Sequence, residues 1–198
     1  MEKLCKSAKN LDIMAAVVFW IFAVFGGLLV IAIGTAPFLP SEFYSNVVTS
    51  VIFDFVEFEI AADYMPDVNG AKIYFICGLA VVLAALIVAC GAVLVVRKIL
   101  KPMKDGLPFD GTVSGNLMKL FYFTLIGGGL FSVVTLVHKI VASKVFDFAN
   151  LFATEKIASI TMEYTLDLSF LYVSAILFVL SLIFRYGEML QKESDETL

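Results

Sequence analysis

A carboxylate-rich segment between the first two apolar stretches has the clearest chemical potential in the chain. Its acidic residues are Glu42, Asp54, Glu57, Glu59, Asp63 and Asp67, and its single basic residue is Lys72. Clustered carboxylates can bind a hard cation such as calcium or attract a cationic peptide. The same cluster can also be a solvated face that binds nothing, and the sequence leaves these alternatives open.

His138 is the single histidine of the chain. A metal site there would need more ligands, which Asp63, Asp67 or Glu155 provide only if the fold brings them close. We expect an interfacial histidine without a metal instead. No serine or cysteine is visibly paired with it as a hydrolase triad requires, and the chain contains no Walker loop, dinucleotide fingerprint or zinc-protease helix. The sequence therefore predicts no catalytic, cofactor-binding or metal-binding residue, no cofactor and no enzymatic activity.

Basic residues gather between the second and third apolar stretches. Arg97–Asp105 form a basic collar there, which should interact with anionic lipid headgroups. Gly106–Thr112 have the composition of a turn that leads into the next helix, with Thr112 or Ser114 as the predicted cap. The end of the chain is acidic. Such a tail can dock on the collar or present a surface to a cytoplasmic partner.

Four apolar stretches without charged residues must position these groups. The chain has 198 residues, of which 61% are hydrophobic and 16% charged, and this composition lies well outside that of soluble proteins. A helix of roughly 20 residues crosses the hydrocarbon core of a bilayer. We therefore predict an all-α membrane protein in which residues 1–198 form one four-helix transmembrane domain. The uncharged stretches are Ile13–Ala36, Ile73–Val96, Leu120–Val137 and Leu168–Phe184. With flanking residues, the predicted spans cover approximately residues 13–36, 73–96, 118–138 and 167–185.

Lysines and arginines are distributed unequally among the segments that connect the predicted spans. They precede the first span and crowd the link between the second and third spans, but they are sparse elsewhere. The positive-inside rule then places both ends of the chain, the link 97–117 and the tail 186–198 in the cytoplasm. The loops 37–72 and 139–166 face outward. We expect a multi-pass protein of the inner (cytoplasmic) membrane, whose first span is too long for the apolar region of a signal peptide.

The outer loops contain signals for secondary structure. Ser41 could cap a short helix that continues to Val51. Phe53–Ile60 and Ile157–Asp167 are rich in β-branched and aromatic residues, which predicts two strands that pair as a small external sheet. In Phe53–Ile60 the alternation of apolar and acidic residues is interrupted at Val56, so the sequence also allows a β-bulge or a helix in this segment. Val137–Phe152 have the spacing of an amphipathic helix that rests at the outer interface.

Small residues recur on single faces of the predicted spans. Helices in a bilayer associate through close contacts at such residues, because expulsion from water does not drive them together. The predicted packing seams are Thr124, Gly128 and Ser132 in the third span, and Ala23 and Gly27 in the first. Three adjacent glycines, Gly127–Gly129, weaken a helix, which predicts a bend or a close helix crossing at this point.

Leu100–Leu120 and Phe184–Leu198 resemble the bacterial membrane family catalogued as domain of unknown function 2975. In that family a link of the form "lkp…g…pF" precedes the third span, and a "GxxLQxExDxT" pattern follows the fourth. The corresponding residues here are Gly106, Pro108 and Phe109 in the link, and Gly187, Leu190, Gln191, Glu193, Asp195 and Thr197 in the tail. The four-span plan extends the resemblance over nearly the whole chain, although only these motifs are specific.

The resemblance implies a membrane partner of a transcription regulator, because members of this family are often encoded beside a small helix-turn-helix protein. No activity is assigned to the family. We expect a non-enzymatic sensor or regulatory partner that acts through its link and tail, with the lipid bilayer and a helix-turn-helix regulator as partners and no direct binding of nucleic acid. Homo-oligomerisation stays open. The residues expected to bind the partner are Gly187, Leu190, Gln191, Glu193, Asp195, Thr197, Lys101 and Lys104.

Two other functions fit the same sequence. The first is a small transporter or an accessory subunit of one, which the lack of ionisable residues inside the four stretches disfavours. The second is immunity against a cationic peptide, which would act through the acidic segment.

Overall fold

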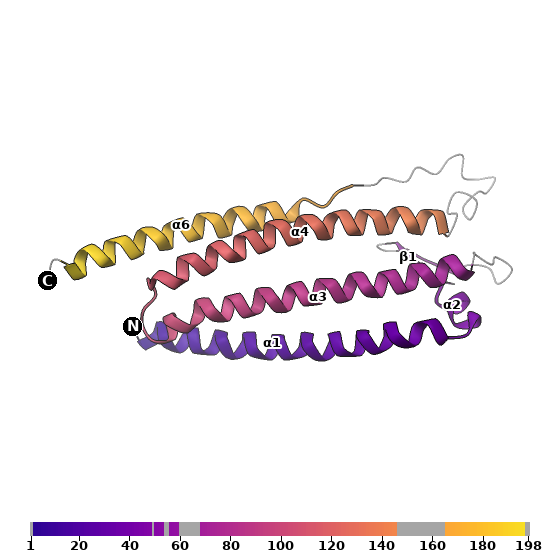
Figure 1. The fold of residues 1–198 in the computed structure, drawn as a ribbon, viewed down its shortest axis with the longest axis horizontal. Helices are drawn as coiled ribbons and strands as arrows, with labels where there is room; N and C mark the ends of the chain where they lie inside the picture. The colour runs from indigo at the N-terminus through magenta and orange to yellow at the C-terminus, as the bar shows by residue number, and fades with distance from the viewer. Residues whose placement is uncertain (1, 49, 54–55, 60–67, 146–164, 197–198) are drawn as a thin grey trace. The chain divides into compact units, whose positions relative to one another are not determined.

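Four long helices account for most of the structure, a computed structural model that describes residues 2–48, 50–53, 56–59, 68–145 and 165–196. They are α1 (Glu2–Thr35), α3 (Val68–Lys104), α4 (Gly111–Val145) and α6 (Ser169–Glu196) (Figure 1). All four are long and apolar enough to cross a membrane. The prediction of an all-α protein with four apolar helices is confirmed, and these helices indicate a multi-pass membrane protein.

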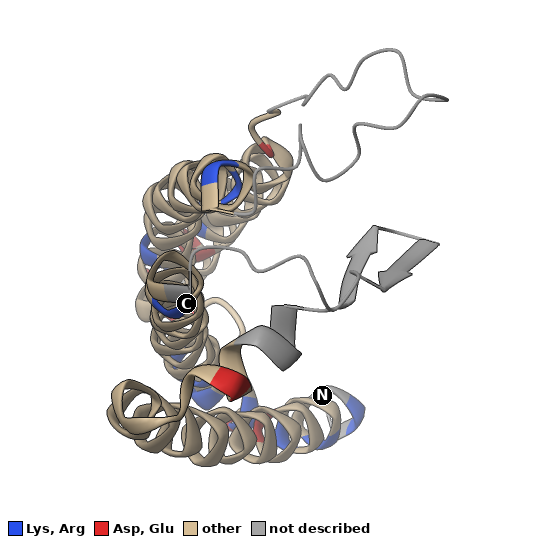
Figure 2. Cartoon of the chain, turned by 90° about the vertical axis from the view of Figure 1, so that its right-hand side faces the viewer, with Lys and Arg blue, Asp and Glu red and all other residues tan. Residues whose placement is uncertain are grey.

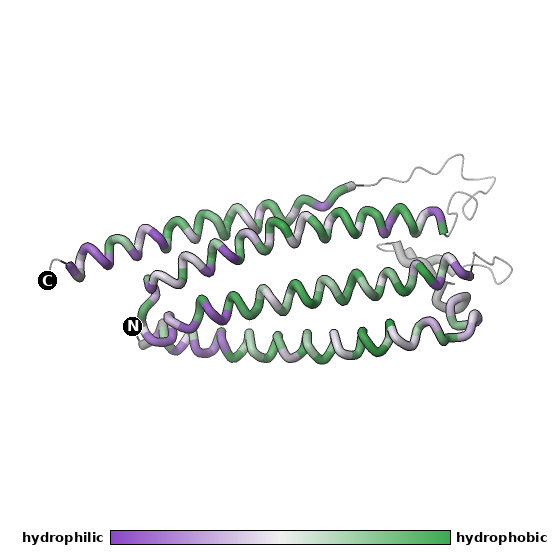
Figure 3. Tube along the Cα trace, in the orientation of Figure 1, coloured by the Kyte–Doolittle hydropathy of each residue, from purple (hydrophilic) through white to green (hydrophobic). Residues whose placement is uncertain are grey.

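The helices extend beyond the apolar stretches into charged sequence. α3 continues through the basic collar to Lys104, and α4 starts at Gly111, so most of the predicted link 97–117 is helical. In Figure 3 the middle of each long helix is mainly green, for hydrophobic, and purple residues are most frequent near helix ends. Charged side chains thus lie where a spanning helix would leave the hydrocarbon core.

Large apolar side chains point outward from the helices. Trp20 is 67% exposed and Tyr172 is 77% exposed, and many leucines, isoleucines and valines are also exposed. A water-soluble chain would bury such surface, because apolar groups are driven out of water. In a bilayer the same side chains face lipid tails of similar polarity.

The chain divides into two compact units. The first consists of Met1–Gly27, Ala84–Ser132 and Asp167–Leu198, and the second of Leu28–Leu83 and Val133–Leu166. The core of the first unit lies among α3, α4 and α6. Its buried members are Ile99, Val113, Leu117 and Leu120, and partly buried side chains such as Leu177 and Phe184 pack against them.

The second unit includes a short 3-10 helix, η1 (Ala36–Phe38), and α2 (Ser41–Val48). Tyr44 of α2 is almost fully buried, and its hydroxyl donates a hydrogen bond to the carbonyl of Ala36. Lys72 Nζ of α3 donates to the carbonyl of Pro37 at 2.6 Å. The short helix predicted after Ser41 is present, but Ser41 is its first residue and not a cap that precedes it.

Two short strands replace the single strand predicted over Phe53–Ile60. β1 (Ser50–Phe53) pairs antiparallel with β2 (Val56–Glu59), with Ser50 opposite Glu59 and Phe53 opposite Val56. The local pairing satisfies backbone groups that an isolated strand would leave without partners. Most of the predicted partner strand, residues 157–164, lies outside the described residues.

The predicted interfacial helix over Val137–Phe152 begins as a continuation of α4. α4 runs without interruption to Val145, and the next residues of the predicted helix lie outside the described part of the chain. The spacing of apolar residues did not reveal this continuity, because it does not show where the third spanning helix ends.

α6 packs closely on α4 at Gly128. A Cβ atom built on Gly128 would contact Phe170 Cβ and lie 2.7 Å from Phe170 Cγ, so only glycine fits here. One turn later, Ser132 Oγ donates a hydrogen bond to the carbonyl of Asp167 at 2.6 Å. Thr124, the third residue of this predicted seam, is partly buried. The tight contact explains why a glycine is useful in an otherwise continuous helix.

The predicted seam on α1 has a different environment. Ala23 is partly buried, but Gly27 is exposed and no atom lies within 4 Å of a Cβ built on it. Within the described part of the chain, no helix packs against Gly27, and the presence of small residues on this face of α1 did not indicate that.

We expect Gly128→Ala to destabilise the protein relative to Gly129→Ala. Both changes favour the helix equally, but only the first forces a methyl group into Phe170, whereas the Cβ of the second would lie 3.6 Å from Phe170 Cζ. The expected difference in unfolding free energy is about 1–3 kcal/mol, measured by SDS titration in detergent. The added change Phe170→Gly removes both the Cβ and the ring that the new methyl group would meet, so it should remove most of this difference. Equal stability of the two single variants would contradict the close contact.

Candidate functional site

Three segments that the sequence predicts to be cytoplasmic meet within the first unit. They are the beginning of α1, the turn between α3 and α4, and the C-terminal half of α6 (Figure 1). We call this region the junction and define it by Asp12, Arg97, Lys104, residues 105–114 and residues 184–188. It brings together the link and tail stretches that carry the family resemblance.

A glycine-terminated helix end forms the turn of the junction. The amide of Leu107 donates to the carbonyl of Pro102 at 3.0 Å, and the amide of Gly106 donates to that of Met103 at 3.3 Å. This is the hydrogen-bond pattern of a Schellman motif, whose glycine adopts a left-handed conformation. Gly106 has φ of 80°, which explains why the turn requires glycine at this position.

Asp110 caps the start of α4. Its Oδ1 accepts hydrogen bonds from the amide of Thr112, at 2.9 Å, and from the Thr112 hydroxyl. The prediction of Thr112 or Ser114 as the cap is wrong, because both lie inside the helix and Asp110 directly precedes it. The hydrogen bonds from Thr112 lower the pKa of Asp110 below its ordinary value of 3.8.

An ion-pair cluster joins α1 to α3 in the junction. Arg97 Nε donates to Asp12 Oδ1 at 2.9 Å, and Lys104 Nζ donates to Asp12 Oδ2 at 2.7 Å. The side chain of Asp12 is only 16% exposed, whereas those of Arg97 and Lys104 are 38% and 30% exposed. One carboxylate therefore neutralises part of a strongly basic helix end.

This cluster changes the interpretation of the collar. Lys104, expected to bind a partner, has its ammonium group on Asp12, whereas Lys101 is exposed. The lysines and arginines of the long helices are blue in Figure 2. Sequence reasoning missed Asp12, which lies just before the first apolar stretch, and no local signal connects it to residues 85 and 92 positions away.

Link and tail contact each other through the motif residues. Phe109 of the link lies over Gly187 of α6, where an added Cβ would be 2.5 Å from the ring, and its ring centroid is 5.7 Å from that of Phe184. Glu188 accepts hydrogen bonds from the amide and hydroxyl of Ser114, at 3.1 and 2.9 Å. A carboxylate at the first turn of α4 also interacts favourably with the helix dipole. Glu188 of the tail thus binds the first turn of α4 and not a lysine of the basic collar.

The rest of the tail motif follows this contact along α6. Leu190 is 48% exposed, and Gln191 and Glu193 are also exposed. Asp195 belongs to α6, but its side chain and all of Thr197 lie outside what the structure describes. Lys192 and Glu196 form a long ion pair of 3.9 Å within the helix. The tail therefore presents a partly apolar, partly acidic surface beyond the junction.

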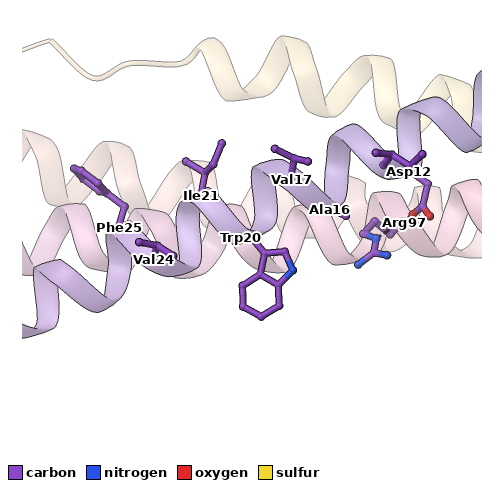
Figure 4. A pocket seen from close by; sticks show the side chains of 9 residues that line it. Asp12, Ala16, Val17, Trp20, Ile21, Val24, Phe25 and Arg97 are labelled. Atoms are coloured by element: carbon purple, nitrogen blue, oxygen red, sulfur yellow. Dashed lines mark hydrogen bonds and ion pairs between the residues drawn. The ribbon is translucent and has the colours of Figure 1, made fainter.

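A groove of about 700 Å³ begins beside the ion pair and follows the outward face of α1. Figure 4 shows Val17, Ile21 and Phe25 along one edge and Trp20 on the other, with Asp12 and Arg97 at one end. Side chains four residues apart form ridges along a helix, and the groove lies between two such ridges of α1. Ala16, which lines the groove, has a small side chain that leaves room in it. The groove is apolar along its length and charged at one end.

His138 lies in the second unit. Its ring stacks on Tyr74 with centroids 4.3 Å apart and packs on Gly78, whose added Cβ would be 3.3 Å from His138 Cε1. Among the described residues, no group of three His, Cys, Asp or Glu side chains is placed to hold a metal. The side chains of the acidic segment from Asp54 to Asp67, and Glu155, lie outside the described set, so a cation or peptide site there stays a prediction.

We expect Asp12→Asn to lower the unfolding free energy by about 1–2 kcal/mol, because two charge-assisted hydrogen bonds weaken and two cations lose their counter-charge. Denaturant titration in detergent, followed by tryptophan fluorescence, measures this. Asp105→Asn is the matched control, since this exposed carboxylate lies at the same helix end, and its effect should stay within about 0.5 kcal/mol. Equal effects of both variants would show that the cluster does not stabilise the fold.

The Asp110 cap should make stability depend on pH in one direction. Because the pKa of Asp110 is lowered in the folded state, its contribution is complete above the unfolded value of 3.8 and disappears as pH falls through the folded value. Asp110→Asn keeps an acceptor oxygen that does not titrate. The melting temperature of the wild type should therefore fall relative to this variant below about pH 4 and run parallel to it from about pH 5 to 7. Parallel curves at acidic pH would contradict the cap.

Comparison with known proteins does not assign the chain to a family. The chain matches no protein-family model, no curated protein and no solved structure. Its resemblance to the domain of unknown function 2975 is therefore an untested prediction, based on the motif residues of the link and the tail.

Proposed function

We propose that this chain is a multi-pass protein of a bacterial cytoplasmic membrane, related to the domain of unknown function 2975, which acts as a non-enzymatic sensor or regulatory partner. In this proposal both chain ends and the α3–α4 turn lie in the cytoplasm, because basic residues concentrate before the first span and between the second and third, and four spans return the C-terminal end to the same side. The acidic loop 37–72 and the loop 139–166 face outward.

The contact between link and tail is the observation that supports a regulatory role best. α6 is one continuous helix, and it contacts α4 at Phe170 and the link again at Gly187, about 25 Å further along its axis. A shift of α6 against α4 inside the membrane would therefore move the tail relative to the link. This gives a change within the bilayer a direct mechanical route to a cytoplasmic surface.

The tail surface fits a protein partner better than a nucleic acid. Beyond the junction it exposes Leu190, Gln191 and Glu193, so it combines apolar and acidic groups. Nucleic-acid binding depends on neutralising phosphates with basic side chains, which an acidic tail does not do. A small helix-turn-helix regulator, with its basic DNA-binding surface, has complementary charge.

Removal of residues 193–198 should abolish recovery of such a regulator from detergent extracts of the native cell. The full-length tagged chain is the bait, and the expected product is a small DNA-binding protein, identified by mass spectrometry. Loss of tail contacts should reduce its recovery at least about tenfold, as expected when a few residues dominate binding. A tail with the same six residues in scrambled order separates sequence recognition from charge.

A matched glycine pair tests the role of the junction. Gly187→Ala pushes Phe109 away, whereas a Cβ on Gly115 meets open space, so only the first variant should reduce recovery of the regulator. Recovery that survives the tail deletion would refute the proposed partner surface.

A further inference from the structure

We propose that the groove on α1 binds one acyl chain of an anionic phospholipid, whose phosphate is bound by Arg97. The site belongs to the first unit, and nothing in the argument depends on the regulator proposed above. The inference combines the shape of the groove, its length and the charge at one of its ends.

The groove suits an acyl chain and not a polar ligand. Between Ile13 and Phe25 its lining is apolar, and the prominent members are exposed: Val17 is 53% exposed, Ile21 58% and Trp20 67%. From Asp12 to Phe25 the helix rises about 20 Å. One leaflet of the hydrocarbon core is about 15 Å thick, so the groove is long enough for a chain that extends from the headgroup region toward the bilayer centre.

Arg97 gives the charged end its preference for an anion. Its Nε is bound to Asp12, which orients the guanidinium, while in the described part of the chain its Nη groups have no hydrogen-bond partner. Guanidinium groups bind phosphate oxygens with two parallel hydrogen bonds. A phosphodiester at this position would complete the hydrogen bonding of Arg97.

The charge around Arg97 also favours an anionic headgroup over a zwitterionic one. Asp12 offsets only one of the two cations that it contacts, so the cluster with Arg97 and Lys104 keeps one positive charge. Lys9, Lys98 and Lys101 are exposed on the same segments of α1 and α3. Each basic residue near a membrane surface increases the attraction of anionic lipid.

Trp20 provides a built-in reporter, because it is the single tryptophan of the chain and lines the groove. The full chain is placed in phosphatidylcholine nanodiscs that contain increasing fractions of phosphatidylglycerol with brominated acyl chains, and Trp20 quenching is measured. Brominated phosphatidylcholine serves as the comparison lipid. We expect phosphatidylglycerol to reach half-maximal quenching at a mole fraction about fivefold lower than phosphatidylcholine.

Arg97→Gln should remove most of this preference, whereas Arg97→Lys keeps the charge but not the two parallel hydrogen bonds and should retain part of it. Lys119→Gln is the matched control, since it removes one exposed positive charge that does not line the groove, and it should leave the preference unchanged. If Arg97→Gln does not fold, Asp12→Asn gives the test in the opposite direction. It removes the competing carboxylate and should strengthen the preference for phosphatidylglycerol.

Three results would overturn the proposal. Equal quenching by the two lipids would mean that α1 meets bulk lipid only, and a preference that persists in Arg97→Gln would mean that general surface charge causes it. Quenching that is weak with both lipids but grows as the protein is diluted into more nanodiscs would assign the groove to a second copy of the chain.

Discussion

The absence of charge from four helix-length stretches is the constraint on which the rest of the structure depends. In a bilayer every backbone polar group must be satisfied within the helix, and the side chains that face lipid can be as apolar as the lipid itself. Exposed residues such as Trp20 and Tyr172 are consistent with this environment. Because apolar contacts then provide little driving force between helices, specific packing depends on a few close approaches and on polar groups at helix ends.

The first unit contains both kinds of contact. Gly128 lets Phe170 approach the backbone of α4, and Gly187 lets Phe109 approach that of α6. At the charged end, Asp12 binds two cations of α3 and Glu188 binds the first turn of α4. Glycines and carboxylates thus perform complementary tasks: glycines let an aromatic ring approach a helix backbone, and carboxylates join segments through charged and backbone groups.

Several local features were predictable because their causes are local. The presence of four long helices follows from the runs of apolar residues, although the helices continue beyond these runs into charged sequence. The turn after α3 follows from Gly106, and the start of α2 from the prolines and Ser41. Errors arose where neighbouring choices have similar energies. The cap of α4 is Asp110 and not Thr112 or Ser114, since all three side chains can accept an amide hydrogen bond and only the helix start decides between them. Likewise, the segment predicted as one strand over Phe53–Ile60 contains the end of β1 and then β2.

By itself, the sequence determined that the chain is helical, that it is apolar enough for a membrane and that its basic residues concentrate in a few segments, because these properties depend on composition and on spacing along the chain. Only the tertiary structure decided that Asp12 meets Arg97 and Lys104, that Phe109 lies on Gly187 and that Arg97 stands at the end of an apolar groove. These contacts join residues as far as 92 positions apart. Their partners depend on which helix faces meet, and apolar helices of similar composition leave that choice open until they pack.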